Sequence, residues 1–180
     1  MRIYGPSHKY FLMRGYAVLD NTAMPMIGDP ETVYDTFVPQ LVADAKAAVE
    51  KAVEMGFADP QKIGVIGHSH GGLMVANLLA HTDLFCAGIA RSGSYNKTNQ
   101  PYGFQGERRS LFEATQSYID CSPTFFADQV NEPILIIHGE DDSNPGTLTF
   151  QSEVFYEAVR GSGGTARLIL LPFEDHGYRA

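Results

Sequence analysis

A serine with small neighbours follows a short apolar run near the middle of the chain. Residues 67–71 read GHSHG, the Gly-x-Ser-x-Gly pattern in which the serine is a nucleophile. Such a serine lies at a sharp, strained turn between a strand and a helix, and glycines are needed because the two elements approach closely. The apolar run at 63–66 precedes the motif and a helical pattern follows it. We therefore predict that Ser69 is the nucleophile of a serine hydrolase, rather than an idle serine in a glycine-rich turn.

A serine hydroxyl is a weak nucleophile until a base removes its proton. His176 follows the last apolar run of the chain, and three consecutive acids at 140–142 follow the run before it. Catalytic groups gather at the carboxyl ends of parallel strands, and Ser, Asp, His is the chain order of α/β-hydrolases. We predict His176 as the general base. Position alone leaves Asp141 and Asp142 as equal candidates for the acid that orients its imidazole.

The residue after the nucleophile has a role of its own. The backbone N–H of His70 is expected to donate to the oxyanion that forms during acyl transfer. His68 and His70 form a conceivable metal pair, but the three or four ligands of a metal site are lacking, so no metal is predicted. No cofactor is predicted either, because no Gly-x-Gly-x-x-Gly follows a strand. His138 ends an apolar run, and we expect it to be structural.

These groups need a scaffold that brings strand ends together. Short apolar runs alternate with helical patterns, which is typical of a parallel sheet covered by helices. We predict an α/β protein with one doubly wound, mostly parallel sheet of the α/β-hydrolase fold. The predicted strands are 16–19, 62–67, 86–90, 134–137 and 168–171, and the predicted helices are 38–53, 73–79, 111–118 and 148–159.

The composition sets limits on the partners. The 180 residues suffice for a single domain, 1–180, and the net charge of −8 argues against binding to nucleic acid or an anionic membrane. No apolar stretch approaches the roughly 20 residues of a membrane helix, and the first residues lack a signal peptide's apolar core. We expect a soluble chain, cytoplasmic by default, of undetermined oligomeric state. Its two cysteines show no Cys-x-x-Cys spacing, and we expect Cys86 to be a buried thiol.

Three segments resemble the catalytic domain of the prolyl oligopeptidase family of serine peptidases. They are GHSHGG at 67–72, His138-Gly139-x-x-Asp142 and Asp175-His176-Gly177. Longer stretches at 76–81, 89–96, 101–105 and 138–147 resemble the glutamyl endopeptidase branch of that family. The resemblance implies hydrolysis of peptide bonds through an acyl-enzyme, and it implies Asp142 rather than Asp141 as the acid of the triad.

The resemblance also implies segments that this sequence does not contain. Members of the family carry a β-propeller before the hydrolase domain, further strands with a tyrosine that helps to build the oxyanion hole, and a closing helix. We therefore expect the sheet to be incomplete at both ends, the chain to be a fragment of a larger enzyme, and its activity alone to be low.

Specificity is expected to come from side chains near the strand ends. Arg91 ends the third predicted strand on the same side of the sheet as Ser69, where a guanidinium could bind an acidic side chain bidentately. The resemblance to glutamyl endopeptidases favours cleavage after Glu, and a structural ion pair is an equally weighted alternative. Further candidates for the substrate site are Tyr95, Tyr102, Phe104 and Asn144. The aromatic residues among them could instead pack the glycine-rich insertion.

Two other functions remain open from the sequence. The same triad would serve a carboxylesterase or an acyl-peptide hydrolase. A hydrolase fold can also act as a catalytically weak or non-catalytic binding module.

Overall fold

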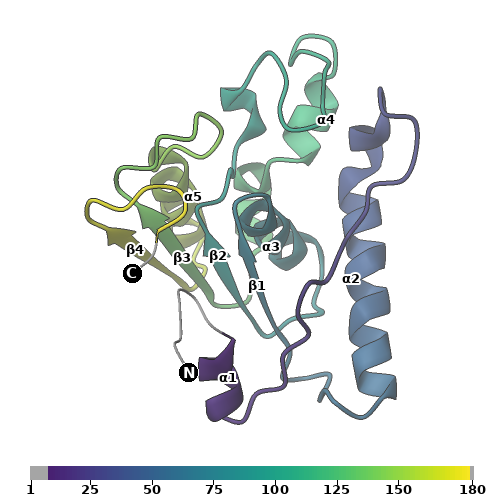
Figure 1. The fold of residues 1–180 in the computed structure, drawn as a ribbon. Helices are drawn as coiled ribbons and strands as arrows, with labels where there is room; N and C mark the ends of the chain where they lie inside the picture. Colours follow the sequence, from purple (N-terminus) through teal and green to yellow (C-terminus); the bar gives the residue numbers. More distant parts are fainter. Residues whose placement is uncertain (1–7, 179–180) are drawn as a thin grey trace.

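The computed structural model describes residues 8–178 (Figure 1). Within them, the centre of the molecule is a four-stranded parallel sheet with the order β1-β2-β3-β4. The strands are β1 (Gly64–His68), β2 (Ala87–Arg91), β3 (Ile134–Gly139) and β4 (Ala166–Leu171). The last four predicted strands and the α/β class with a parallel sheet are thereby confirmed.

The helices agree with the periodic patterns except in the insertion, where α4 begins four residues later than predicted. The α-helices are α1 (Lys9–Met13), α2 (Phe37–Glu54), α3 (His70–His81), α4 (Thr115–Asp120) and α5 (Phe150–Gly161). The 3₁₀ segments of the described residues are η1 (Val33–Thr36), η2 (Lys97–Asn99) and η3 (Pro123–Gln129). None of the helices in residues 8–178 has the length and apolar character needed to cross a membrane.

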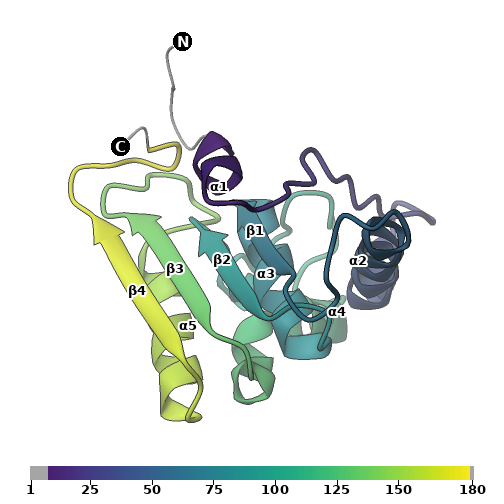
Figure 2. The ribbon, with the colours of Figure 1, turned by 90° about the horizontal axis from the view of Figure 1, so that it is seen from below.

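The helices form a layer against the sheet. Because the strand order follows the chain order, crossovers of one hand place their helices on the same face. Helix α3 packs on β1 and β2, α5 packs on β3 and β4, and α2 packs against α3. Figure 2 shows α3 and α5 on the same side of the sheet. On β1, Ile66 remains 46% exposed.

The core lies between this helical layer and the sheet. Phe37 and Leu41 of α2, Leu73 of α3 and Ile136 of β3 are essentially inaccessible to solvent. Burying each such side chain contributes roughly 1.5–3 kcal/mol relative to leaving it exposed. This packing fixes α3, whose N-terminus carries the turn that holds Ser69.

Two sequence-based expectations outside the site are wrong. Residues 16–19 form no strand, and Tyr16 and Leu19 are 62% and 66% exposed. A short apolar run becomes a strand only where a neighbouring strand pairs with it, and pairing is a tertiary property. Cys86 is exposed rather than buried, and it lies in the connection just before β2. Cys86 and Cys121 are both free thiols.

Candidate active site

The turn from β1 to α3 holds Ser69 in a strained conformation. Strand β1 ends at His68, α3 begins at His70, and Ser69 between them has φ 59° and ψ −117°. A side chain at Gly67 would overlap the backbone of Gly71, so only glycine permits this approach of strand and helix. The N–H of Ser69 donates to the carbonyl of Arg91 on β2 at 2.8 Å. The turn thus fixes the serine at the carboxyl end of the sheet.

The loop after β4 brings an imidazole to this serine. Nε2 of His176 lies 2.9 Å from Oγ of Ser69. A side chain at Gly139, the end of β3, would overlap the carbonyl of Glu174, so the loops after β3 and β4 pack closely. Asp175 accepts hydrogen bonds from the N–H of His176 at 2.7 Å and from the N–H of Ser143 at 3.0 Å. These backbone contacts set the position of the histidine ring.

A buried carboxylate from the loop after β3 lies behind the imidazole. Oδ2 of Asp142 is 2.8 Å from Nδ1 of His176, and the Asp142 side chain is fully buried. Asp141 is exposed, and its backbone N–H donates to the carbonyl of Glu174. The structure therefore brings Ser69, His176 and Asp142 together and leaves Asp141 in solvent.

Asp142 is held by a second histidine that sequence reasoning took as structural only. Nε2 of His138 lies 2.9 Å from Oδ2 of Asp142 and 2.7 Å from the carbonyl oxygen of Thr147. Because both neighbours are acceptors, Nε2 must carry a proton. Nδ1 lies 2.6 Å from Oγ of Ser152, and burial lowers the pKa of His138. A neutral His138 therefore accepts from Ser152 and donates to Asp142.

The two histidines beside Ser69 are also largely uncharged. Burial, with a contribution from Lys97, lowers the pKa of the His70 imidazole to about 4. Burial and the nearby His176 lower the pKa of His68. The backbone N–H of His70 lies in the first turn of α3, where N–H groups have no intrahelical partner and favour negative charge. No cluster of three or more His, Cys, Asp or Glu able to hold a metal occurs in the part of the chain that the structure describes.

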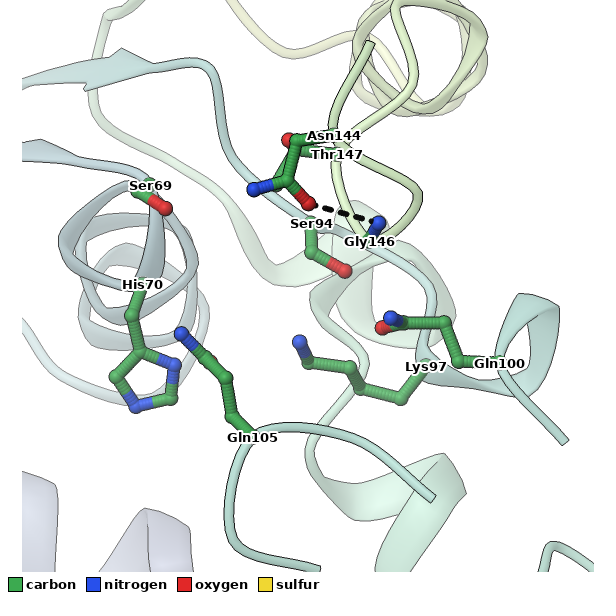
Figure 3. A pocket seen from close by; sticks show the side chains of 9 residues that line it. All are labelled: Ser69, His70, Ser94, Lys97, Gln100, Gln105, Asn144, Gly146 and Thr147. Atoms are coloured by element: carbon green, nitrogen blue, oxygen red, sulfur yellow. Dashed lines mark hydrogen bonds between the residues drawn. The ribbon is translucent and has the colours of Figure 1, made fainter. Parts of the chain in front are cut away.

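A cavity of about 100 Å³ opens beside Ser69 (Figure 3). Asn144 is the one residue among the five predicted for substrate binding that lines it. Sequence reasoning missed Lys97 and Gln105, which line it from the insertion after β2, because this irregular segment has no periodic pattern. The full lining is Ser69, His70, Ser94, Lys97, Gln100, Gln105, Asn144, Gly146 and Thr147.

Arg91 contacts a tyrosine rather than the cavity. Its Nε donates to the hydroxyl of Tyr178 at 2.8 Å, and its guanidinium lies 4.6 Å from the centre of the Tyr178 ring. The contact of Arg91 with a substrate therefore stays a prediction, and the alternative ion pair with an acid does not occur within residues 8–178. Its half-buried side chain instead supports the loop that follows His176.

None of the three aromatic residues predicted for the substrate site lines this cavity, and two of them take the alternative role of packing the insertion. Tyr95 is fully buried and stacks on Phe155 of α5, with ring centres 4.6 Å apart. Phe104 is buried and packs edge-on against Tyr118. Tyr102 is 83% exposed and does not line the cavity. Large aromatic side chains in the insertion bury apolar area, which outweighs a place at a polar cavity.

Residues 33–180 match the sequence description of the prolyl oligopeptidase family. Relatives named "probable glutamyl endopeptidase, chloroplastic" from Oryza sativa subsp. japonica and Arabidopsis thaliana are each 53% identical over 172 residues. The alignments cover 94% of this chain but only 18% of each relative. A solved acylaminoacyl peptidase in complex with Z-Gly-Gly-Phe-chloromethyl ketone is 28% identical and aligns with a TM-score of 0.66 over 77% of this chain and 22% of its own. The predicted α/β-hydrolase fold is thereby confirmed.

Removing the imidazole of His138 should weaken the site without touching Ser69. We expect His138→Phe to slow labelling of Ser69 by a fluorophosphonate about 10- to 100-fold, the value of one hydrogen bond to a charged group. Ser152→Ala removes the hydrogen bond between Ser152 and Nδ1 of His138 and leaves the one between His138 and Asp142, so its effect on the labelling rate should be smaller. Equal labelling rates for His138→Phe and the unsubstituted protein, both folded, would contradict this role.

The histidines with lowered pKa should make the protein less stable in acid. Burial lowers the pKa of His68, His70, His81 and His138. Between pH 6.5 and 4 the unfolded chain therefore binds more protons than the folded one, so stability falls as pH falls. His70 alone contributes at most about 3 kcal/mol to this loss. Urea unfolding at pH 7 and pH 5 should show it, and His70→Phe should reduce the difference; an unaltered difference would argue against a buried neutral His70.

Proposed function

Since the chain belongs to the prolyl oligopeptidase family, we propose that it carries the catalytic groups of a serine-type peptidase acting through an acyl-enzyme on Ser69. The observation that carries this proposal is the continuous hydrogen-bonded chain from Oγ of Ser69 through His176 to Asp142. Nucleophile, base and orienting acid are the three roles that acyl transfer requires.

The chemistry follows from these contacts. Nε2 of His176 accepts the proton of Ser69 as Oγ attacks the peptide carbonyl, and Asp142 stabilises the imidazolium that forms. The imidazolium then protonates the leaving amine, which breaks the C–N bond and leaves an ester on Ser69. In the second half, His176 accepts a proton from water as water attacks this ester, and then returns it to Oγ. Asp142 keeps the proton of His176 on Nδ1, so that Nε2 is free to act as the base.

The oxyanion of each tetrahedral intermediate is assigned to the backbone N–H of His70. The N-terminus of α3 adds its partial positive charge at the same point. Loss of one oxyanion donor costs on the order of 10²–10³ in rate. We include in the proposal a second donor and an N-terminal β-propeller supplied by a longer polypeptide, since the chain spans only 18% of the glutamyl endopeptidases it matches.

A pair of adjacent carboxylates gives the sharpest test of the triad. We expect Asp142→Asn to lower fluorophosphonate labelling by a factor on the order of 10³ or more, because His176 loses its orienting acceptor. The matched variant Asp141→Asn, one residue earlier and in solvent, should label at the rate of the unsubstituted protein. Ser69→Ala should not label at all. Equal losses in the two Asn variants, or labelling that survives Ser69→Ala, would exclude this triad.

Substrate class is tested by comparing an amide with an ester. We expect the protein to cleave internal bonds of an N-acetylated peptide that contains Glu, and Ser69→Ala to abolish this cleavage. Turnover of a short-chain ester without any peptide cleavage would instead indicate a carboxylesterase. Removal of an acetylated N-terminal residue only would indicate an acyl-peptide hydrolase, and a protein that neither labels nor turns over either substrate would be a binding module.

A further inference from the structure

Lys97 is a buried cation whose charge has no counterpart among the described residues. It is 2% exposed and begins the short segment η2. Its Nζ lies 4.9 Å from the ring centre of Phe104, and no carboxylate within residues 8–178 forms an ion pair with it. By contrast, the guanidinium of Arg109 pairs with Glu107 and with Asp35, each at 2.7 Å.

A lysine in such surroundings is costly to keep. Removing an ammonium group from water is unfavourable unless hydrogen bonds or an opposite charge replace the lost hydration. The contact with the Phe104 face offsets only part of that cost. Burial lowers the pKa of Lys97 to about 8, so the side chain is still mostly charged at neutral pH. The site therefore favours any ligand that brings a negative charge to Nζ.

The cavity beside Ser69 is where such a ligand would lie. Ser69 and Lys97 line the same cavity, and Figure 3 shows the Lys97 side chain extending into it next to Gln105. None of the nine lining residues is Asp or Glu. With His70 neutral, Lys97 is the charged group of this lining. The volume of the cavity, about 100 Å³, is several times the volume of about 10–15 Å³ that one water molecule needs.

We propose that Lys97 determines specificity by binding the carboxylate of an acidic side chain on the residue whose carbonyl Ser69 attacks. This inference rests on the proposed function and names the group that reads the substrate. A charge-assisted hydrogen bond from Nζ to the carboxylate would replace the counter-ion that the described residues do not supply. A neutral side chain of the same shape would leave the ammonium unpaired.

The same geometry assigns Arg91 a different task. Its guanidinium is bound to the hydroxyl and the face of Tyr178, and it does not line the cavity. An acidic side chain in the cavity would therefore meet Lys97 rather than Arg91. Replacing each cation by methionine, which removes the charge and keeps an unbranched side chain of similar length, should therefore have different effects. Loss of the Lys97 charge should abolish the preference for an acidic side chain, and loss of the Arg91 charge should not.

Binding to a Ser69→Ala background tests this proposal without turnover. The probes are N-acetylated tetrapeptide amides that carry Glu, Gln or Leu at one position and are otherwise identical. The affinity of the full chain for each peptide is measured by calorimetry. We expect the Glu peptide to bind about 10- to 100-fold tighter than the Gln peptide, as for a hydrogen bond between charged groups. Lys97→Met should remove this difference, and Lys97→Arg should retain most of it.

Two matched variants serve as controls. Lys62→Met removes an exposed lysine that pairs with Asp59, and Arg91→Met removes the rival cation; both should keep the preference for Glu. Should Lys97→Met fail to give a folded chain, Lys97→Gln provides the same comparison. A preference for Glu that survives loss of the Lys97 charge, or equal binding of the Glu and Gln peptides, overturns the proposal. Fluorophosphonate labelling of unsubstituted protein separately reports on the proposed function.

Discussion

The buried carboxylate of Asp142 is the contact on which the rest of the site depends. It accepts hydrogen bonds from His176, from His138 and from the backbone N–H of Asn144. Each donor comes from a different part of the structure, the loop after β4, the end of β3 and the loop that follows it. A fully buried charge is tolerated only with such a complete set of donors. The same hydrogen bonds also fix the imidazole of His176, so the contacts that stabilise the buried carboxylate orient the ring that faces Ser69.

The surroundings of Ser69 differ in charge on its two sides. On one side, His176 and Asp142 form a pair in which the negative charge is already satisfied. On the other, the cavity holds Lys97 near a histidine whose imidazole is neutral because of burial. Had His70 been protonated, its charge would have repelled Lys97. Burial of His70 thus leaves one cation in the lining, and that cation is free to select the charge of a substrate.

The sequence predicted the scaffold well because the relevant signals are local. Helices α2, α3 and α5 have apolar positions at helical spacing, and the glycines around Ser69 report a close approach of neighbouring elements. Residues 16–19 show the limit of such reasoning, since an apolar run becomes a strand only if another strand lies beside it. The insertion after β2 shows a second limit. Its aromatic residues looked suited to a pocket, but Tyr95 and Phe104 bury themselves in the core.

The sequence by itself determined the nucleophile turn and the order of the reactive groups along the chain, because spacing and neighbouring residue types encode both. Position along the chain could not choose between Asp141 and Asp142, which are adjacent and identical in chemistry, and only the resemblance to the family favoured Asp142. Only the tertiary structure decided that one is buried against His176 and the other is in solvent. The tertiary structure also distinguished Arg91 from Lys97, because the groups that contact each cation lie far from it in the sequence. The hydroxyl of Tyr178 accepts a hydrogen bond from Arg91, whereas no carboxylate within residues 8–178 pairs with Lys97 beside Ser69.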